Sequence, residues 1–178
     1  MSQGVTVRAR YRQELREVAT RFREEFDLID PYIDIERLVD IKMPGKIPGF
    51  YLAVEDSQNM GPALGYANTR ARVIHIREDV YEKMRKGNED ARMVVMHEIG
   101  HLVLHTPDQI LLGFTQGKIL VQCSEWQADT FAAETMAHHE YLPLVTKGAR
   151  EFARLTGVPV PVAVKQWHHY EREGMKSK

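Results

Sequence analysis

The residues best suited to chemistry are His97 and His101, which flank Glu98 in the sequence His97-Glu98-Ile99-Gly100-His101. Residues four positions apart lie one above the other on a helix, about 5–6 Å apart, so the two imidazoles can converge on one zinc ion. Glu98 then projects beside them, where its carboxylate can take a proton from a water that zinc activates. The spacing predicts a catalytic zinc site with Glu98 as general base; two helix-surface histidines without a metal are the alternative.

A catalytic zinc site needs a third protein ligand and an open position. Glu125 is favoured because it begins a predicted helix and shares a face of that helix with Asp129. Asp129 can then accept the free ring N–H of a ligand histidine, an arrangement common around zinc. The alternatives are that Glu125 is only an acid favoured by a helix N-terminus and that Asp129 is an ordinary exposed carboxylate.

The other histidines and the single cysteine are weaker ligand candidates. His105 extends the histidine row by one more turn of about 5.4 Å, too far for three histidines in line to surround one ion. We expect it to close the helix C-terminus as a partly cationic imidazole. Cys123 can bind a soft metal but is expected to be a small buried residue. The neighbours in His138-His139 and in His168-His169 point apart on a helix, so we expect surface positions, with oxyanion stabilisation as the minor alternative.

Hydrophobic periodicity predicts the elements that must position these groups. An apolar stripe predicts an N-terminal helix over 7–29, and a helical extension is expected over 146–174. Residues 89–105 form a helix that is apolar on most sides and therefore central, and 124–136 form another. Short helices are expected over 33–39 and 79–86, and residues 44–49 are expected to form a loop. Strands are predicted over 50–54 and 71–77, with a weaker one within 60–68. The fold class is α+β: a small mixed or antiparallel sheet packed on the central helix, in one domain spanning 1–178.

Composition narrows the function classes. The 178 residues include 24 Lys and Arg against 25 Asp and Glu, so the net charge is −1 and direct nucleic-acid binding is unlikely on this ground. Cys123 is the single cysteine, which excludes an intramolecular disulfide and favours a cytoplasmic protein. No apolar run reaches the roughly 18 residues of a membrane helix, and the N-terminus lacks the apolar core of a secretory signal. The composition therefore predicts a soluble protein without a membrane partner.

Taken together, three motifs resemble the ImmA/IrrE family of zinc metallopeptidases over about 33–136. The motifs are Arg77-Glu78-Asp79-Val80-Tyr81, then Ala91-Arg92 with His97-Glu98-Ile99-Gly100-His101 and Leu104-His105, and Glu125-x-x-Ala128-Asp129-x-Phe131-Ala132-Ala133. The resemblance implies a zincin-like fold with zinc on His97, His101 and Glu125 and with Glu98 as general base. It also implies a protein substrate, often a DNA-binding repressor.

Three functions follow as hypotheses. The main one is a zinc-dependent endopeptidase that binds substrate backbone as an added strand at a sheet edge and cleaves a regulatory protein at a specific site. The alternative is a regulatory module that holds zinc and docks to a partner without proteolysis. A DNA-binding regulator, acting through the C-terminal helices or the Arg-rich N-terminal helix, is the third.

Overall fold

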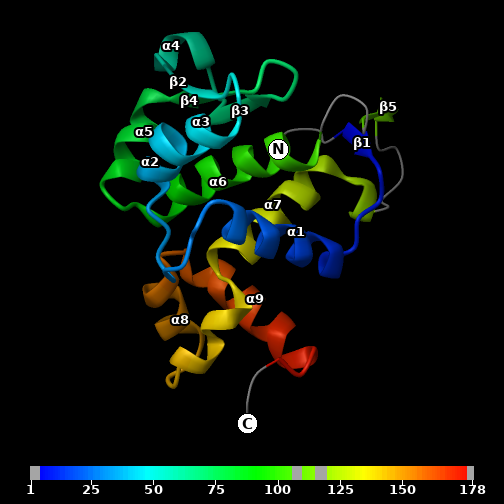
Figure 1. The fold of residues 1–178 in the computed structure, drawn as a ribbon, viewed down its shortest axis with the longest axis vertical. Coiled ribbons are helices and arrows are strands. Elements are labelled where there is room, and N and C mark those ends of the chain that lie inside the picture. Colours follow the sequence, from blue (N-terminus) through cyan, green and yellow to red (C-terminus); the bar gives the residue numbers. More distant parts are fainter. Residues whose placement is uncertain (1–4, 106–109, 115–119, 176–178) are drawn as a thin grey trace.

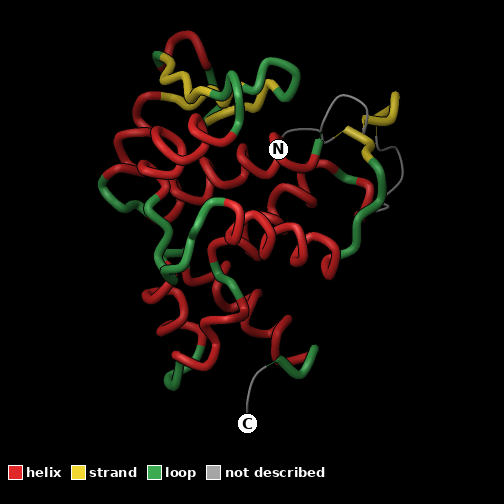
Figure 2. The backbone as a smooth tube through the Cα atoms, in the orientation of Figure 1, coloured by secondary structure: helices red, strands yellow, loops and turns green. Residues whose placement is uncertain are grey.

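The structure is a computed structural model that describes residues 5–105, 110–114 and 120–175. It is an α+β fold, mostly helical, with a small sheet at one end (Figures 1 and 2). The elements are β1 (Val5–Val7), α1 (Arg12–Glu25), α2 (Ile35–Arg37), the π-helical turn η1 (Leu38–Lys42), α3 (Met43–Lys46), β2 (Tyr51–Glu55), α4 (Ser57–Met60), β3 (Gly65–Asn68), β4 (Val73–Arg77), α5 (Glu78–Arg85), α6 (Glu89–Leu104), β5 (Ile110–Phe114), η3 (Leu120–Gln122), α7 (Ser124–Met136), η4 (His139–Leu144), α8 (Ala149–Thr156) and α9 (Val160–Arg172).

The main sheet has three strands in the order β2-β4-β3, with β2 parallel and β3 antiparallel to the central β4. The predicted mixed sheet is thus confirmed, including the weaker third strand. Residues on β4 alternate, so Ile74 and Ile76 are fully buried while His75 and Arg77 are half-buried on the opposite face. In Figure 1, α6 runs beside this sheet and contacts β3 and β4, with β3 as an edge strand.

Helix α6 is the predicted central helix. The side chain of Asn88 caps its first turn by accepting a hydrogen bond from the Ala91 N–H at 2.9 Å. Val95, Met96 and Ile99 are fully buried on it, which explains why the sequence is apolar on most sides. The buried apolar residues of α6 therefore fix the position of the polar residues that lie between them in the sequence.

Helix α7 contacts α6 at a point where both helices carry small residues, Gly100 on α6 and Ala128 on α7. A Cβ added to Gly100 would lie 3.1 Å from both the Cα and the carbonyl oxygen of Ala128, so the two backbones approach closely there. On its other side α7 packs against α1, where the rings of Phe22 and Phe131 meet edge to face at 5.4 Å. Helix α7 is thus held between α6 and α1.

The N-terminal helix is shorter than the expected 7–29. Residues 5–7 form strand β1, which pairs antiparallel with β5, and α1 begins only at Arg12, where Glu14 accepts a hydrogen bond from the Tyr11 N–H at 2.6 Å. The chain leaves the helix at Phe26, and Asp27 adopts a positive φ of 50°. Beyond α1, Phe26 and Leu28 still face the core, whereas Ile29, where the expected helix ends, is 82% exposed.

A second correction concerns 33–46, where a helix over 33–39 and then a loop were expected. The chain stays helical from Ile35 to Lys46 through α2, η1 and α3. Pro44 lies in the first turn of α3, the helical position that tolerates proline, so the Pro-Gly pair does not break the segment here.

Helices α8 and α9 lie within the range 146–174 given for the C-terminal extension, and they are joined by a turn at Gly157 with a φ of 66°. This extension is joined to the rest of the molecule through the fully buried carboxylate of Glu134 on α7. Glu134 accepts hydrogen bonds from Arg12 at 2.7 Å, from Arg16 at 2.9 Å and from the Tyr170 hydroxyl at 2.9 Å. One buried acid therefore links α1, α7 and α9.

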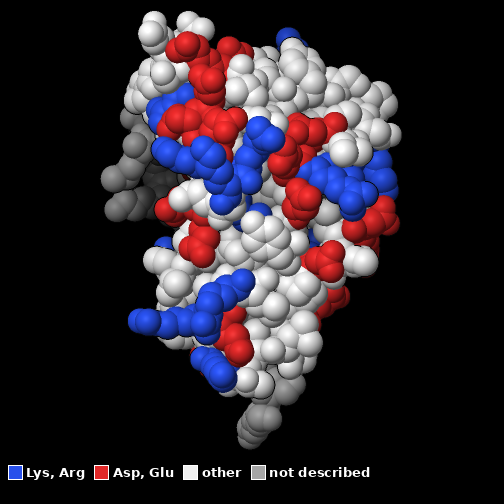
Figure 3. All heavy atoms as spheres, turned by 90° about the vertical axis from the view of Figure 1, so that its left-hand side faces the viewer, with Lys and Arg blue, Asp and Glu red and all other residues white. Residues whose placement is uncertain are grey.

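The described helices include none long and apolar enough to cross a membrane. On the face drawn in Figure 3, basic and acidic side chains are interspersed.

Candidate metal centre

His97, His101 and Glu125 come together where the first turn of α7 faces α6. One ligand atom from each lies within 4.8 Å of the others. The Nε2 atoms of the two histidines are 3.0 Å apart, and carboxylate oxygens of Glu125 lie 3.6 Å from His97 Nε2 and 3.4 Å from His101 Nε2. The three side chains remain 17–28% exposed at a cavity of about 340 Å³, so a ligand can reach them.

The chemistry of this donor set fits a divalent metal. Two imidazole nitrogens whose lone pairs meet at 3.0 Å beside a carboxylate repel one another unless a proton or a cation lies between them. Two histidines and one glutamate also form the donor set of one class of catalytic zinc sites, which keep a further position open. The three residues that the sequence selected are therefore suited in type and position to hold such an ion.

Asp129 lies where the sequence analysis expected it, beside a candidate ligand histidine. Its Oδ1 is 2.7 Å from Nδ1 of His97, although its own side chain is 74% exposed. Burial is the largest influence and lowers the pKa of His97, but hydrogen bonds to Asp129 and Glu125 outweigh it and raise the pKa to about 10. The bond to Asp129 keeps a ring hydrogen on Nδ1 and turns Nε2 toward the centre.

Glu98 lines the same cavity and is 7% exposed. Burial raises the pKa of its carboxyl, and the neighbouring His97 and His101 oppose that rise. The backbone N–H of Ala67 on the edge strand β3 also hydrogen-bonds to this carboxylate. A Cβ on Gly65 would lie 3.1 Å from Cγ of Glu98, so β3 passes close to the acid.

His105 is the C-cap residue of α6, as expected, but it is not cationic. It is 3% exposed, and burial, followed by the charge of His101, lowers its pKa to about 4. Its Nδ1 is 3.0 Å from Nδ1 of His101, and its Nε2 is 3.2 Å from Oε1 of Gln127. Sequence reasoning missed Gln127, because nothing in its spacing from the histidines marks it.

The remaining candidates lie outside the three-residue cluster. Cys123 is half-buried rather than buried and is the N-cap residue of α7. His138 is fully buried, which corrects the expected surface position; its Nε2 is 2.9 Å from the Thr20 hydroxyl, because α1 covers it. His168 is exposed and His169 half-buried on α9.

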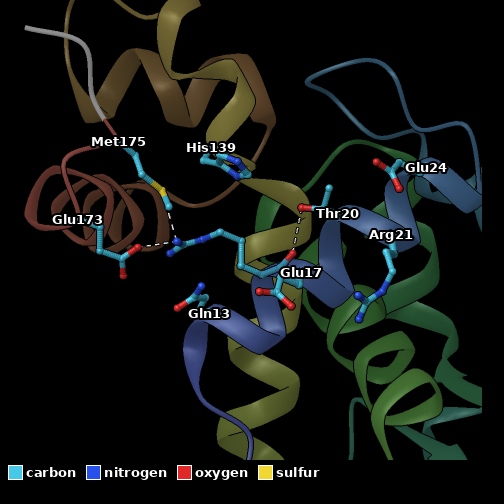
Figure 4. Close-up of a pocket in the computed structure, with 9 residues that line it drawn as sticks. Gln13, Glu17, Thr20, Arg21, Glu24, His139, Glu173 and Met175 are labelled. Atoms are coloured by element: carbon cyan, nitrogen blue, oxygen red, sulfur yellow. Dashed lines mark hydrogen bonds and ion pairs between the residues drawn. The ribbon is translucent and has the colours of Figure 1, made fainter.

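His139 lines a separate open cavity of about 850 Å³ along α1, drawn in Figure 4. There Arg16 donates to Glu173 at 2.5 Å and lies 3.3 Å from the sulfur of Met175, while Thr20 donates to the backbone oxygen of Arg16. This cavity shares no lining residue with the one at Glu98, and within it Arg16 forms an ion pair with Glu173.

No family model and no curated protein matches the chain. A solved structure described as a Mycobacterium tuberculosis transcriptional regulator is similar in fold, with a TM-score of 0.52 and 16% sequence identity. The match covers 85% of this chain and 54% of that one, so this chain spans about half the length of that protein. At this identity the likeness concerns the fold alone.

Proposed function

We propose that the protein is a zinc-dependent endopeptidase with a zincin-like fold, of the ImmA/IrrE type. The observation that carries this proposal is the convergence of two histidine Nε2 atoms and the Glu125 carboxylate beside the buried acid Glu98. A binding site for metal alone has no need of that acid, whereas a hydrolase needs a base next to the ion.

His97, His101 and Glu125 would hold the metal. Bound there, zinc would polarise the scissile carbonyl and lower the pKa of a coordinated water to about 7. Glu98 would accept a proton from the attacking water and deliver it to the leaving amine. Burial supports this role, because it raises the pKa of Glu98 toward the range where one carboxyl can both take and return a proton.

The edge strand β3 supports a polypeptide substrate. Gly65, Tyr66 and Ala67 line the cavity that contains Glu98, and within the described part of the chain β3 pairs with β4 alone. An extended peptide would add alongside β3 through main-chain hydrogen bonds, which places a peptide bond beside the metal centre. The resemblance to the ImmA/IrrE family suggests that the substrate is a DNA-binding repressor cleaved at one site.

A regulatory module that holds metal without proteolysis is the second candidate. The observation in its favour is the fold shared with a protein described as a transcriptional regulator. The buried acid at the centre favours the endopeptidase.

A substrate trap tests the proposal. Glu98→Gln keeps the ligand set but removes the base, so it should bind zinc as the wild type does and should cleave no protein. Glu89→Gln, an exposed acid in the first turn of the same helix, is the matched control and should keep full activity. The zinc-loaded variants are exposed to lysate of the source cell, and retained proteins are identified by mass spectrometry.

The outcomes separate the two candidates. A retained protein that the wild type cuts and Glu98→Gln does not supports the endopeptidase. Cleavage by Glu98→Gln at the wild-type rate refutes it, and a retained partner that zinc-loaded wild type never cuts favours the regulatory module.

A further inference from the structure

The amide of Gln127 can be oriented in only one way. It is fully buried on α7, and its Nε2 lies 2.8 Å from the backbone oxygen of Arg8 and 2.7 Å from that of Val121. Carbonyl oxygens only accept hydrogen bonds, so the donor end of the amide must face them. The acceptor end, Oε1, therefore faces Nε2 of His105 at 3.2 Å.

This orientation decides where the proton of His105 lies. Because Oε1 of Gln127 can only accept, Nε2 of His105 must carry the hydrogen. His105 is 3% exposed, and burial of this kind favours the neutral imidazole over the cation. In the neutral ring the other nitrogen then has the lone pair, so Nδ1 of His105 is an acceptor. Its partner at 3.0 Å is Nδ1 of His101, which must therefore be the donor.

We propose that Gln127 and His105 are positioning residues that fix the tautomer of His101 with its proton on Nδ1 and its Nε2 lone pair facing the metal centre. The inference rests on the metal-binding part of the proposed function. The other tautomer would place a hydrogen on Nε2, where it would block the ion. Such outer partners orient ligand histidines and raise their basicity.

The two ligand histidines are thus oriented from different sides. His97 donates to Asp129, a charged group that is mostly exposed. His101 donates to the neutral, buried His105, which in turn donates to the buried amide of Gln127. In both rings Nδ1 makes the bond to the outer partner, and the two Nε2 atoms face each other at 3.0 Å.

The series of hydrogen bonds from His101 through His105 and Gln127 ends at the backbone of two segments, one before α1 and one before α7. These segments are joined by the hydrogen bond from the Arg10 N–H to the Val121 oxygen at 3.0 Å. The N-terminal segment is seated further by the bond from the Val5 N–H to the Ser124 hydroxyl at 3.0 Å. Correct seating of the N-terminal segment is therefore part of what orients His101.

The first test measures tautomers in the zinc-free wild-type protein by ¹⁵N NMR of the imidazole rings. We expect His105 to carry its proton on Nε2 and His101 on Nδ1, while the exposed His168 shows a mixture. A proton on Nε2 of His101 would overturn the proposal. The measurement needs no variant, no zinc and no hydrolysis, so its result is independent of whether the protein is a peptidase.

The second test replaces the amide by a side chain of similar length that cannot make these hydrogen bonds. Gln127→Met should weaken zinc binding by about 10–100-fold, measured by competition with a chromophoric chelator, and should leave His101 with mixed tautomers. Gln166→Met is the matched control, because Gln166 is equally buried but bonds to Arg12 and Tyr170 instead. It should bind zinc like the wild type.

Equal zinc affinity of Gln127→Met and wild type would overturn the proposed role of Gln127 and His105 as positioning residues. Absence of zinc binding by the wild type would refute the metal centre itself. If Gln127→Met does not fold, as judged by circular dichroism, the tautomers of the wild type decide the matter.

Discussion

Each candidate ligand histidine has one ring nitrogen committed to a partner, and this leaves the other for a metal. His97 uses Asp129 for this purpose, and His101 uses His105. At the scale of single residues, the candidate metal centre therefore includes side chains that would not touch an ion.

Asp129→Ala should weaken zinc binding by about 10–100-fold, because His97 loses the acceptor that holds its proton on Nδ1. Competition with a chelator measures the change. Asp90→Ala is the control, since Asp90 is an exposed acid at the start of α6 and should not alter affinity. Unchanged affinity in Asp129→Ala would show that the hydrogen bond does not orient the ring.

At the scale of elements, the site depends on how closely α6 and α7 approach. The histidines are placed by the period of one helix, but Glu125 reaches them only because Gly100 and Ala128 let the two backbones meet. The crossing point lies one residue before His101 and three residues after Glu125, so any separation of the helices moves the ligands apart.

Gly100→Ala tests this contact. The new Cβ would lie 3.1 Å from backbone atoms of Ala128, which cannot rotate away, so α7 must shift and zinc affinity should fall by about tenfold or more. Gly45→Ala on α3 is the control, because a Cβ there meets nothing within 4 Å. It should leave affinity unchanged and stabilise the protein by about 0.4–1 kcal/mol. Wild-type affinity in Gly100→Ala would contradict the close-approach argument.

At the scale of the whole molecule, α1 and the C-terminal helices bury polar groups against α7. Glu134 takes bonds from both Arg12 and Arg16, and His138 lies under α1 against Thr20. Burial, then the charges of His139, Arg23 and Arg16, lowers the pKa of His138 to about 3. The packing of these helices is therefore sensitive to protonation.

The pKa of His138 predicts how stability changes with pH. An unfolded histidine titrates near 6.5, so between pH 6.5 and about 3 the unfolded chain binds a proton at this position that the folded chain does not. The contribution of neutral His138 to the free energy of unfolding is complete above pH 6.5. It decreases as the pH falls, by about 1–2 kcal/mol at pH 5. Urea unfolding at pH 7 and pH 5 should show a smaller loss in His138→Gln than in wild type. Equal losses in the two proteins would contradict the assignment.

Much of the fold was predictable because its signals are local. Helix α6, helix α7 and the strands β2 and β4 were found from periodicity, and their observed bounds differ from the expected ones by at most two residues. The spacing of His97 and His101 places them on one helical face whatever surrounds the helix. Their identity as zinc ligands, with Glu125, remains a prediction.

The corrections at the N-terminus and at His138 arise from contacts that no local pattern contains. Strand β1 forms because β5 lies beside it, and His138 is buried because α1, 118 residues earlier, covers it. The amide of Gln127 bonds to a carbonyl 119 residues away.

The sequence by itself determined that His97 and His101 share one face of a helix, because this follows from residue type and helical period over five neighbouring positions. Only the tertiary structure decided how those residues are oriented. The proton on His101 depends on His105, then on Gln127, and finally on the backbone of two segments that folding brings together. Which ring nitrogen donates depends on the hydrogen-bond partner, and these partners are distant in the sequence. The sequence alone therefore does not predict the tautomer.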